Sequence, residues 1–449
     1  MLSSTRLLLA ALSASQLFFL GDINKVIAAE SSNLQLELQS TFNYRDSESY
    51  AFPVSFPFPP EALPVGQESA FLETVDAGKH LEVSNISLKG AWKITPNWRL
   101  LFKIDAIDLY DRNPTSQDQK VDADTFLLRY GKKSSAKRPA KTFNYYLQLG
   151  KFGKMERQND RHLQSYGLVS SAFNRFEDAG VELGIDLTPQ LYLKTSYTTG
   201  NPVFIRDPNA LAGDNGTRDR QLPPNNPDPE LKSGIVILYD AEIEHFNLNK
   251  NPEIGFGIGF RPQTQDKRWQ SDIFAWFYQR ELAEERELNG TFYGADLDLL
   301  DGAVGFGLPT SGDKKKEFGL NYWLYRDSFT LFAQYVDQTL AGLKRTGKEL
   351  ELAYKISLPF NWTFNGKPVI KSITPALRYS DLNTDFSGGG GFPAPSASWD
   401  WRKIDAGFNI EFQHRTTLTI EYNKNDFETI LGTGHSDEFL TSLNWRYRW

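Results

Sequence analysis

The sequence predicts an all-β protein, an antiparallel transmembrane β-barrel, and three observations lead to this fold class. From residue 33 onward, apolar and polar residues alternate with a period of two, which gives a strand one apolar and one polar face. Charged residues recur between apolar neighbours along strands of about ten residues, longer than most strands of soluble proteins. The connections alternate between tight turns and long polar segments, as the periplasmic turns and outer loops of such a barrel do.

The composition of the 449-residue chain agrees with this fold class and excludes others. There is no cysteine, so no disulfide, thiolate metal site or lipoprotein anchor can form. Aromatic residues make up 14% of the chain, enough for the two aromatic girdles of a barrel. No run of about 18 apolar residues follows the N-terminus, so no spanning helix is expected. The net charge of −7 argues against nucleic acid as a partner.

Residues 1–29 have the pattern of a signal peptide, which leaves residues 30–449 for the outer-membrane barrel. Arg6 precedes an apolar stretch from Leu7 to Gly21, and cleavage is expected after Ala28 or Ala29. An uncleaved N-terminal helix is the alternative, but the stretch is short and polar for a membrane span.

The alternation predicts about 18 strands, or about 16 as the alternative, and an even number puts both termini on the periplasmic side. The pattern is weakest at 269–280 and 290–300, where Phe274, Trp276 and Phe277 interrupt it, and loss of this pair would leave the smaller barrel. The strands are expected near 33–44, 81–94, 98–108, 122–131, 142–152, 175–187, 190–199, 233–245, 252–261, 269–280, 290–300, 316–325, 328–338, 347–358, 368–380, 399–413, 416–424 and 437–449.

The long polar segments all fall on one side of the barrel in this count. On the opposite, periplasmic side, a basic run from Lys132 to Lys141 is expected to be a solvated turn. The long segments are 45–80, 109–121, 153–174, 200–232, 301–315, 381–398 and 425–436.

A barrel of about 16 to 18 strands leaves room for water in its lumen, unless loops or a plug fill it. Strands begin close to the expected cleavage site, so inward-folding loops must narrow the lumen. The segment 153–174 is the candidate constriction, because Lys154, Arg157 and Arg161 lie in it and the planar arginine fork suits carboxylate or phosphate. A solvated outer loop is the alternative for this segment.

The alternation along each strand places both cationic and anionic side chains in the lumen, so no strong preference for anions or for cations is expected. Cations gather on the early strands and anions on the strand near 233–245. We hypothesise that these two groups face each other as opposed arcs and set an electric field across the pore. The candidate pore-lining and constriction residues are Lys89, Arg99, Lys103, Arg129, Lys154, Arg157, Arg161, Asp178, Glu182, Asp240 and Glu242.

Two motifs resemble the Gram-negative outer-membrane porin superfamily. The last strand has aromatic residues at Trp445, Tyr447 and the terminal Trp449, and resembles the strand by which the barrel-assembly machinery recognises such proteins, most of which end in Phe. The segment from Leu147 to Phe152, the loop after it and the segment from Phe176 to Leu183 resemble a strand–loop–strand unit of porins, phosphate-selective ones included. The resemblance implies a channel with this loop in its pore. The arginine ladder of phosphate-selective members is not found in the sequence.

The expected function is passive diffusion of small polar or charged solutes through the outer membrane, without a cofactor or metal. Lipid, lipopolysaccharide and the barrel-assembly machinery are the expected partners, and a homotrimer and a monomer remain open. An exporter of an anionic polysaccharide, of the alginate type, is the alternative, although the mixed lumen charges do not favour it. A hydrolase is less favoured, because only five histidines occur and no Gly-x-Ser-x-Gly motif is present.

Overall fold

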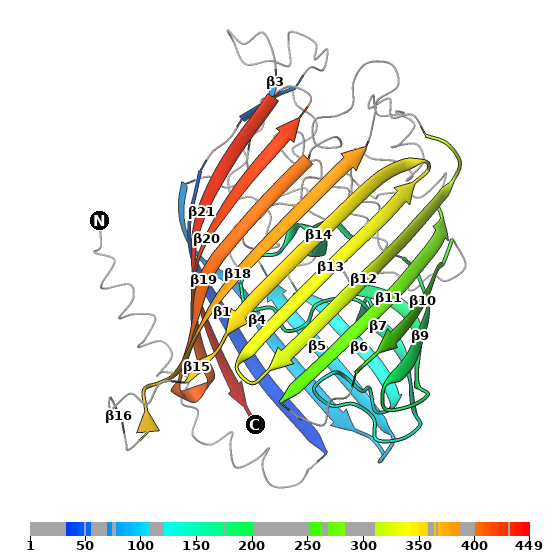
Figure 1. Ribbon diagram of the computed structural model, residues 1–449. Coiled ribbons are helices and arrows are strands. Elements are labelled where there is room, and N and C mark those ends of the chain that lie inside the picture. Colours follow the sequence, from blue (N-terminus) through cyan, green and yellow to red (C-terminus); the bar gives the residue numbers. More distant parts are fainter. Residues whose placement is uncertain are drawn as a thin grey trace.

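Most of the strands form one closed barrel in the computed structural model (Figure 1). The structure describes residues 33–48, 51–54, 70–73, 78–107, 121–173, 177–200, 251–262, 268–282, 310–357, 363–364, 367–385, 400–429 and 432–449. The barrel strands are β1 (Leu34–Ser47), β4 (Gly78–Lys93), β5 (Trp98–Ile107), β6 (Val121–Gly131), β7 (Asn144–Gly153), β8 (Glu177–Asp186), β9 (Leu191–Thr198), β10 (Glu253–Phe260), β11 (Trp269–Glu281), β12 (Lys314–Arg326), β13 (Phe329–Leu340), β14 (Leu343–Tyr354), β15 (Ile356–Ser357), β18 (Ile370–Asp385), β19 (Asp400–Phe412), β20 (Thr416–Thr429) and β21 (Gly432–Arg448).

Each strand pairs antiparallel with its sequence neighbours, and the first strand closes the ring. β1 pairs with β4 on one side and with β21 on the other, so the sheet has no open edge. Leu38 lies opposite Tyr447, and the backbone N–H of Trp449 donates to the carbonyl of Leu36 at 3.0 Å. The start of β1 and the end of the chain therefore lie together at one end of the barrel, which is called the terminal end below.

The barrel has 16 strand positions, because β14 and β15 both pair with β18 and share one position. The prediction of 18 strands is therefore wrong, and the smaller alternative is confirmed. The expected strands 233–245 and 290–300 lie outside the described residues, and the barrel closes without them, since β9 pairs directly with β10 and β11 with β12. The segment near 269–280, one of the two weakest of the predicted strands, is β11.

The predicted alternation is confirmed along the barrel wall, with polar side chains inside and apolar side chains outside. On β10, Ile254 and Phe256 are 56% and 51% exposed, while Glu253 is fully buried. On β19, Phe408 faces outward and Lys403 is fully buried. Exposed apolar and buried charged residues invert the pattern of a water-soluble protein and suit a wall with lipid outside and a polar lumen inside.

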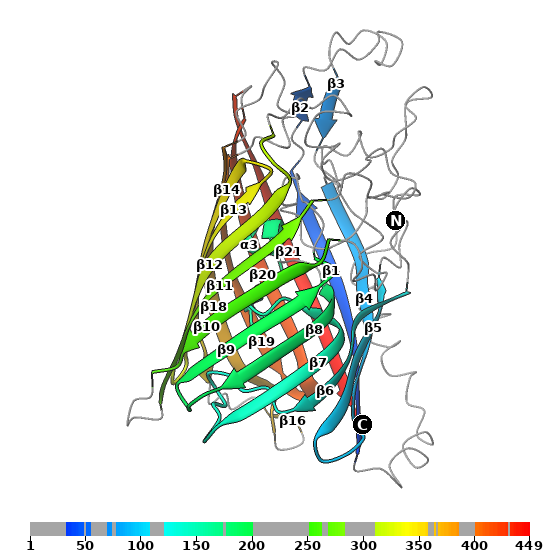
Figure 2. The same cartoon turned by 90° about the vertical axis from the view of Figure 1, so that its right-hand side faces the viewer.

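The remaining elements are short. β2 (Ala51–Val54) pairs with β3 (Ala70–Glu73), and β16 (Thr363–Phe364) pairs with β17 (Lys367–Pro368), both as two-stranded sheets outside the barrel. The helix α3 (Leu168–Phe173) lies inside the ring of strands (Figure 2). None of the helices in the described ranges is long and apolar enough to cross a membrane. The expected signal peptide, residues 1–29, lies outside the described residues.

Candidate functional site

The segment 154–173, here called the lumen loop, leaves the end of β7 and enters the interior of the barrel. Its first residue, Lys154, is one of a cluster of four buried charges. Lys154 Nζ lies 2.8 Å from Glu253 Oε1 and 3.8 Å from Glu317 Oε1, and Lys315 Nζ lies 2.8 Å from Glu253 Oε2. All four side chains are 2% exposed or less. Burial lowers the pKa of Lys154, but the carboxylates of Glu253 and Glu317 outweigh it and hold this pKa above its ordinary value.

The next turn of the lumen loop bonds to the inner faces of β11 and β12. The phenol of Tyr278 donates to Glu156 Oε2 at 2.6 Å and accepts from the backbone N–H of Met155 at 3.3 Å. Asn321 Nδ2 donates to the carbonyl of Glu156 at 2.6 Å. These contacts fix both the side chain and the backbone of Glu156 against the wall.

Burial of the Glu156 carboxyl group gives a testable pH dependence. Burial raises the pKa of Glu156 to about 7, against the opposing effect of Lys154. This folded-state pKa exceeds the ordinary value of 4.5, so the protonated carboxyl group stabilises the folded protein. This stabilisation is complete below pH 4.5 and is lost as the pH rises to about 7. Glu156→Gln should therefore flatten the fall of the unfolding temperature between these pH values. Parallel pH curves for wild type and variant in thermal unfolding would contradict this assignment.

Apolar side chains of the lumen loop pack on an inward-facing aromatic platform. Phe274, Trp276 and Tyr278 of β11 point into the barrel and form one buried cluster with loop residues. Glycines on the adjacent strands make room for these rings, since a Cβ on Gly257 would lie 2.3 Å from Phe274 Cζ and one on Gly319 would lie 2.1 Å from Trp276 Cζ2. The cluster consists of Met155, Leu168, Val169, Ala172, Phe173, Tyr192, Phe274, Trp276, Tyr278, Val336, Leu382 and Trp401.

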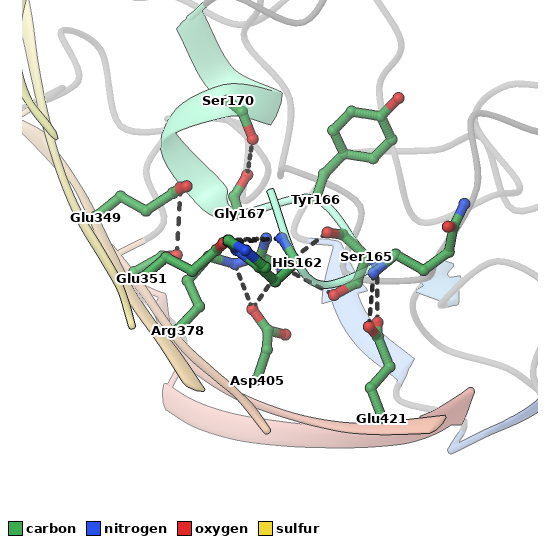
Figure 3. A network of polar contacts seen from close by, with 12 residues as sticks. His162, Ser165, Tyr166, Gly167, Ser170, Glu349, Glu351, Arg378, Asp405 and Glu421 are labelled. Atoms are coloured by element: carbon green, nitrogen blue, oxygen red, sulfur yellow. Dashed lines mark hydrogen bonds and ion pairs between the residues drawn. The ribbon is translucent and has the colours of Figure 1, made fainter. Parts of the chain in front are cut away.

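Beyond this platform, the backbone of the lumen loop is bonded to acidic side chains of the facing wall (Figure 3). Glu421 of β20 accepts from the N–H groups of Gln164 and Ser165 at 2.7 and 2.8 Å. Glu351 of β14 accepts from the N–H of His162 at 2.9 Å and lies 3.0 Å from its Nδ1. The wall thus satisfies loop N–H groups that would otherwise be buried without partners.

Basic side chains of the same wall bond to the loop carbonyls. Arg378 Nη2 of β18 donates to the carbonyl and Oγ of Ser165 at 2.8 and 2.9 Å, and its Nε donates to Asp405 Oδ2 at 2.8 Å. Lys403 of β19 donates to the carbonyl of Tyr166 at 2.7 Å. The lumen loop is therefore tied to β10–β12 at its start and to β14, β18, β19 and β20 further on, and it crosses the lumen between these walls.

Another arc of the wall, on β4, β5 and β6, carries cations in cross-strand rows. Arg99 lies opposite Lys93 on one side and Arg129 on the other, and Lys89 lies opposite Lys103. Like charges that face each other across strands are destabilising. Partial compensation comes from Asp105 and Asp124, which lie 2.6 and 3.0 Å from Lys103, and from glutamines, which accept from Lys89 and Arg129. This arc is the cationic part of the candidate pore wall.

The structure places the remaining predicted site residues near the lumen loop or on β8. Arg157 pairs with Glu177, and the guanidinium of Arg161 lies 3.6 Å from the ring centre of Tyr166. Asp178 accepts from Thr198 at 3.1 Å, and Glu182 accepts from Tyr146 at 2.7 Å. Asp240 and Glu242 lie outside the described residues, so the hypothesis of opposed charge arcs rests on its cationic half alone.

Several residues that hold the lumen loop were not singled out as site residues from the sequence. The alternation along the strands does place Glu351, Arg378, Asp405 and Glu421 in the lumen. Only the fold, however, brings these side chains to residues 162–166. The described residues contain no cluster of three or more acidic or histidine side chains that could hold a metal ion.

Comparisons with known proteins bear on the fold. No family model matches the sequence, and no curated protein matches it either. The high-pH structure of OprB from Pseudomonas putida superposes with a TM-score of 0.51 at 9% identity, over 95% of this chain and 97% of that one. The fold is similar to that of OprB.

Two further solved structures are similar over most of the chain. OmpF of Salmonella typhi, in complex with daunomycin, gives a TM-score of 0.47 at 11% identity, over 92% of this chain and 98% of that one. The outer membrane channel DcaP of Acinetobacter baumannii gives a TM-score of 0.45 at 11% identity, over 93% of this chain and 99% of that one.

Proposed function

We propose that this chain forms a water-filled channel in the outer membrane, through which small polar or charged solutes diffuse passively. The observation that carries the proposal is a closed barrel with a polar inner face, crossed by a loop that is tied to both walls. Such a loop narrows the lumen, and in an open channel pore width and lumen charges set which solutes pass. In this proposal, the lumen loop is the constriction.

The outer face of the barrel supports the location. Apolar side chains face outward along the strands. At the terminal end the rings of Trp445, Tyr447 and Trp449 lie in a row, the first two stacked with centroids 6.2 Å apart and the last two edge to face at 5.1 Å. Aromatic rows of this kind lie at the interface between membrane and water. The terminal end would then face the periplasm, with lipid and lipopolysaccharide around the barrel and β21 as the segment that the barrel-assembly machinery recognises.

Neither alternative function is favoured by the geometry. A hydrolase needs a nucleophile that is hydrogen-bonded to a base. Ser165 lies close to His162 in the chain, but its hydroxyl bonds to Asn423 and Arg378, while His162 bonds to Glu351. An exporter of anionic polysaccharide needs a wide cationic lumen, whereas here a loop crosses the lumen and acidic side chains hold it.

Single-channel recording tests the channel directly. The refolded protein, inserted into a planar lipid bilayer in potassium chloride, should give discrete conductance steps. An inserted protein that passes no current would contradict the proposal. A gel shift between heated and unheated samples provides the control, because it reports a folded barrel independently of conductance.

Charge reversal on the cationic arc tests its role in ion selection. Lys103→Glu should shift the reversal potential in a salt gradient toward cation preference, since it removes the cation that Asp105 and Asp124 face and leaves three acids together. Lys79→Glu is the control, because Lys79 pairs with Asp46 at 3.7 Å and is 71% exposed. Equal reversal potentials for the two variants would show that the cationic arc does not determine ion selectivity.

A further inference from the structure

The connection 132–143 between β6 and β7, here called the basic turn, contacts the inner wall of the barrel. It is longer than other turns at the terminal end, such as Gln413–Arg415. Lys133 Nζ lies 2.9 Å from Glu182 Oε1, a fully buried carboxylate on the inner face of β8. Ser134 Oγ donates to Asp186 Oδ1 at 2.6 Å and accepts from Arg261 Nη1 at 3.0 Å. Most of the turn is exposed, as the prediction of a solvated turn expects, but these inward-facing partners hold Lys133 and Ser134 at the mouth of the barrel.

The basic turn also reaches across the mouth to the lumen loop. Lys137 Nζ lies 3.1 Å from Asp160 Oδ2 of the lumen loop and 4.0 Å from the ring centre of Tyr325 on β12. Tyr325 in turn donates to Asp160 Oδ2 at 2.5 Å. Five strand steps separate β7 from β12 in the barrel. Neighbouring strands lie about 4.8 Å apart, so this contact spans roughly 24 Å of wall.

Internal hydrogen bonds hold the basic turn in shape. The backbones of Ser135 and Arg138 bond to each other in both directions at 3.1 and 3.0 Å, which makes the tip a tight hairpin. At the base, Asn144 Nδ2 donates to the carbonyl of Lys132 at 2.9 Å and to Asp186 Oδ2 at 2.8 Å. Bonds at base, wall and tip therefore fix the turn in the mouth.

The basic turn also carries positive charge at the mouth of the barrel. Lys133 and Lys137 are ion-paired, but Lys132, Arg138 and Lys141 are exposed and form no ion pair within the described parts of the chain. Three exposed cations on a turn at the mouth of the barrel raise the local concentration of anions and lower that of cations.

We propose that the basic turn is a second, cationic constriction at the terminal end of the lumen, in series with the lumen loop, and that it passes small anions more readily than cations. The proposal rests on the proposed channel function and adds the ion class that the channel favours. Two constrictions in series share the resistance of the pore, so relief of either one raises the conductance.

Charge removal tests the ion preference. In a potassium chloride gradient, the triple variant Lys132→Gln, Arg138→Gln, Lys141→Gln should shift the reversal potential toward potassium relative to wild type. A matched control removes three exposed cations from the outer face near the opposite end, with Lys314→Gln, Lys316→Gln and Lys344→Gln, and should leave the potential unchanged. An unchanged potential in the first variant, or an equal shift in both, would overturn the anion preference.

Removal of the tip tests the constriction. Replacement of residues 134–138 by a short Gly-Ser linker should raise the single-channel conductance while the lumen loop stays in place. A tip-less variant that is folded by the gel-shift criterion and conducts like wild type would overturn the second constriction and leave the channel function standing. A wild-type protein that does not conduct would instead overturn the channel function, and this proposal with it.

Discussion

Replacement of residues 158–170 by a short Gly-Ser linker should raise the single-channel conductance at least about twofold, since the narrowest section of a pore dominates its resistance. The replaced segment contains the residues that bond to Glu351, Arg378 and Glu421, and none of the barrel strands. The barrel should therefore still close, with a wider lumen. Single-channel recording in a planar bilayer measures the change.

A point variant tests whether releasing the lumen loop from the wall, without removing it, also changes the conductance. Arg378→Met cuts the bonds to Ser165 without shortening the chain, and should give a higher and noisier conductance than wild type. The matched control is Arg402→Met on β19, whose side chain is 68% exposed and pairs with Asp381 at 3.6 Å. Wild-type conductance in both the linker variant and Arg378→Met would show that the lumen loop does not limit the current.

The second large effect is expected at the start of the lumen loop, where Lys154→Met should destabilise the folded protein by about 3–5 kcal/mol. The substitution leaves Glu253 and Glu317 buried and removes a cation that pairs with both of them, while Lys315 stays within 2.8 and 3.6 Å of them. An uncompensated buried charge costs far more than a lost exposed pair. Equilibrium unfolding by denaturant in detergent micelles measures the free energy.

Two further variants test the cause of this loss. Lys154→Met combined with Glu253→Gln removes one charge of each sign and should recover part of the lost stability. Lys355→Met breaks a pair of 3.0 Å whose side chains are 51% and 36% exposed, and should cost at most about 1 kcal/mol. A loss in Lys154→Met no greater than that in Lys355→Met would mean that the buried cluster does not hold the loop.

The barrel could be predicted from the sequence because its strands follow a local rule. The alternation at each strand depends only on which face points outward, and this rule predicted where the strands lie and which residues face the lumen. The number of strands does not follow locally, because alternation at 233–245 and 290–300 does not say which strands pair. The weak pattern at β11 has a physical cause, since Phe274 and Trp276 face inward against the lumen loop and make both faces of the strand apolar.

The site could be predicted only in part, for the same reason. Charged residues in 153–174 singled out this segment, but the composition of a loop that enters the lumen resembles that of one in solvent. The distinction lies in partners far along the chain, such as Glu421 for the N–H of Ser165, 256 residues away. The contacts of the basic turn were missed for the same reason, because Glu182 and Asp186, which bond to Lys133 and Ser134, lie two strands further on.

The pairing of β1 with β21 has a consequence for biogenesis. Ser47 bonds to Glu438 across 391 residues, and Arg448 bonds to Glu37 across 411 residues. Contacts between such distant residues form slowly, and these cannot form before the whole chain has been synthesised. Until the two ends meet, the growing sheet exposes two unpaired edges that can capture other chains. Insertion should therefore depend on a helper that shields both edges, and the joining of the chain's ends should be its last and slowest step.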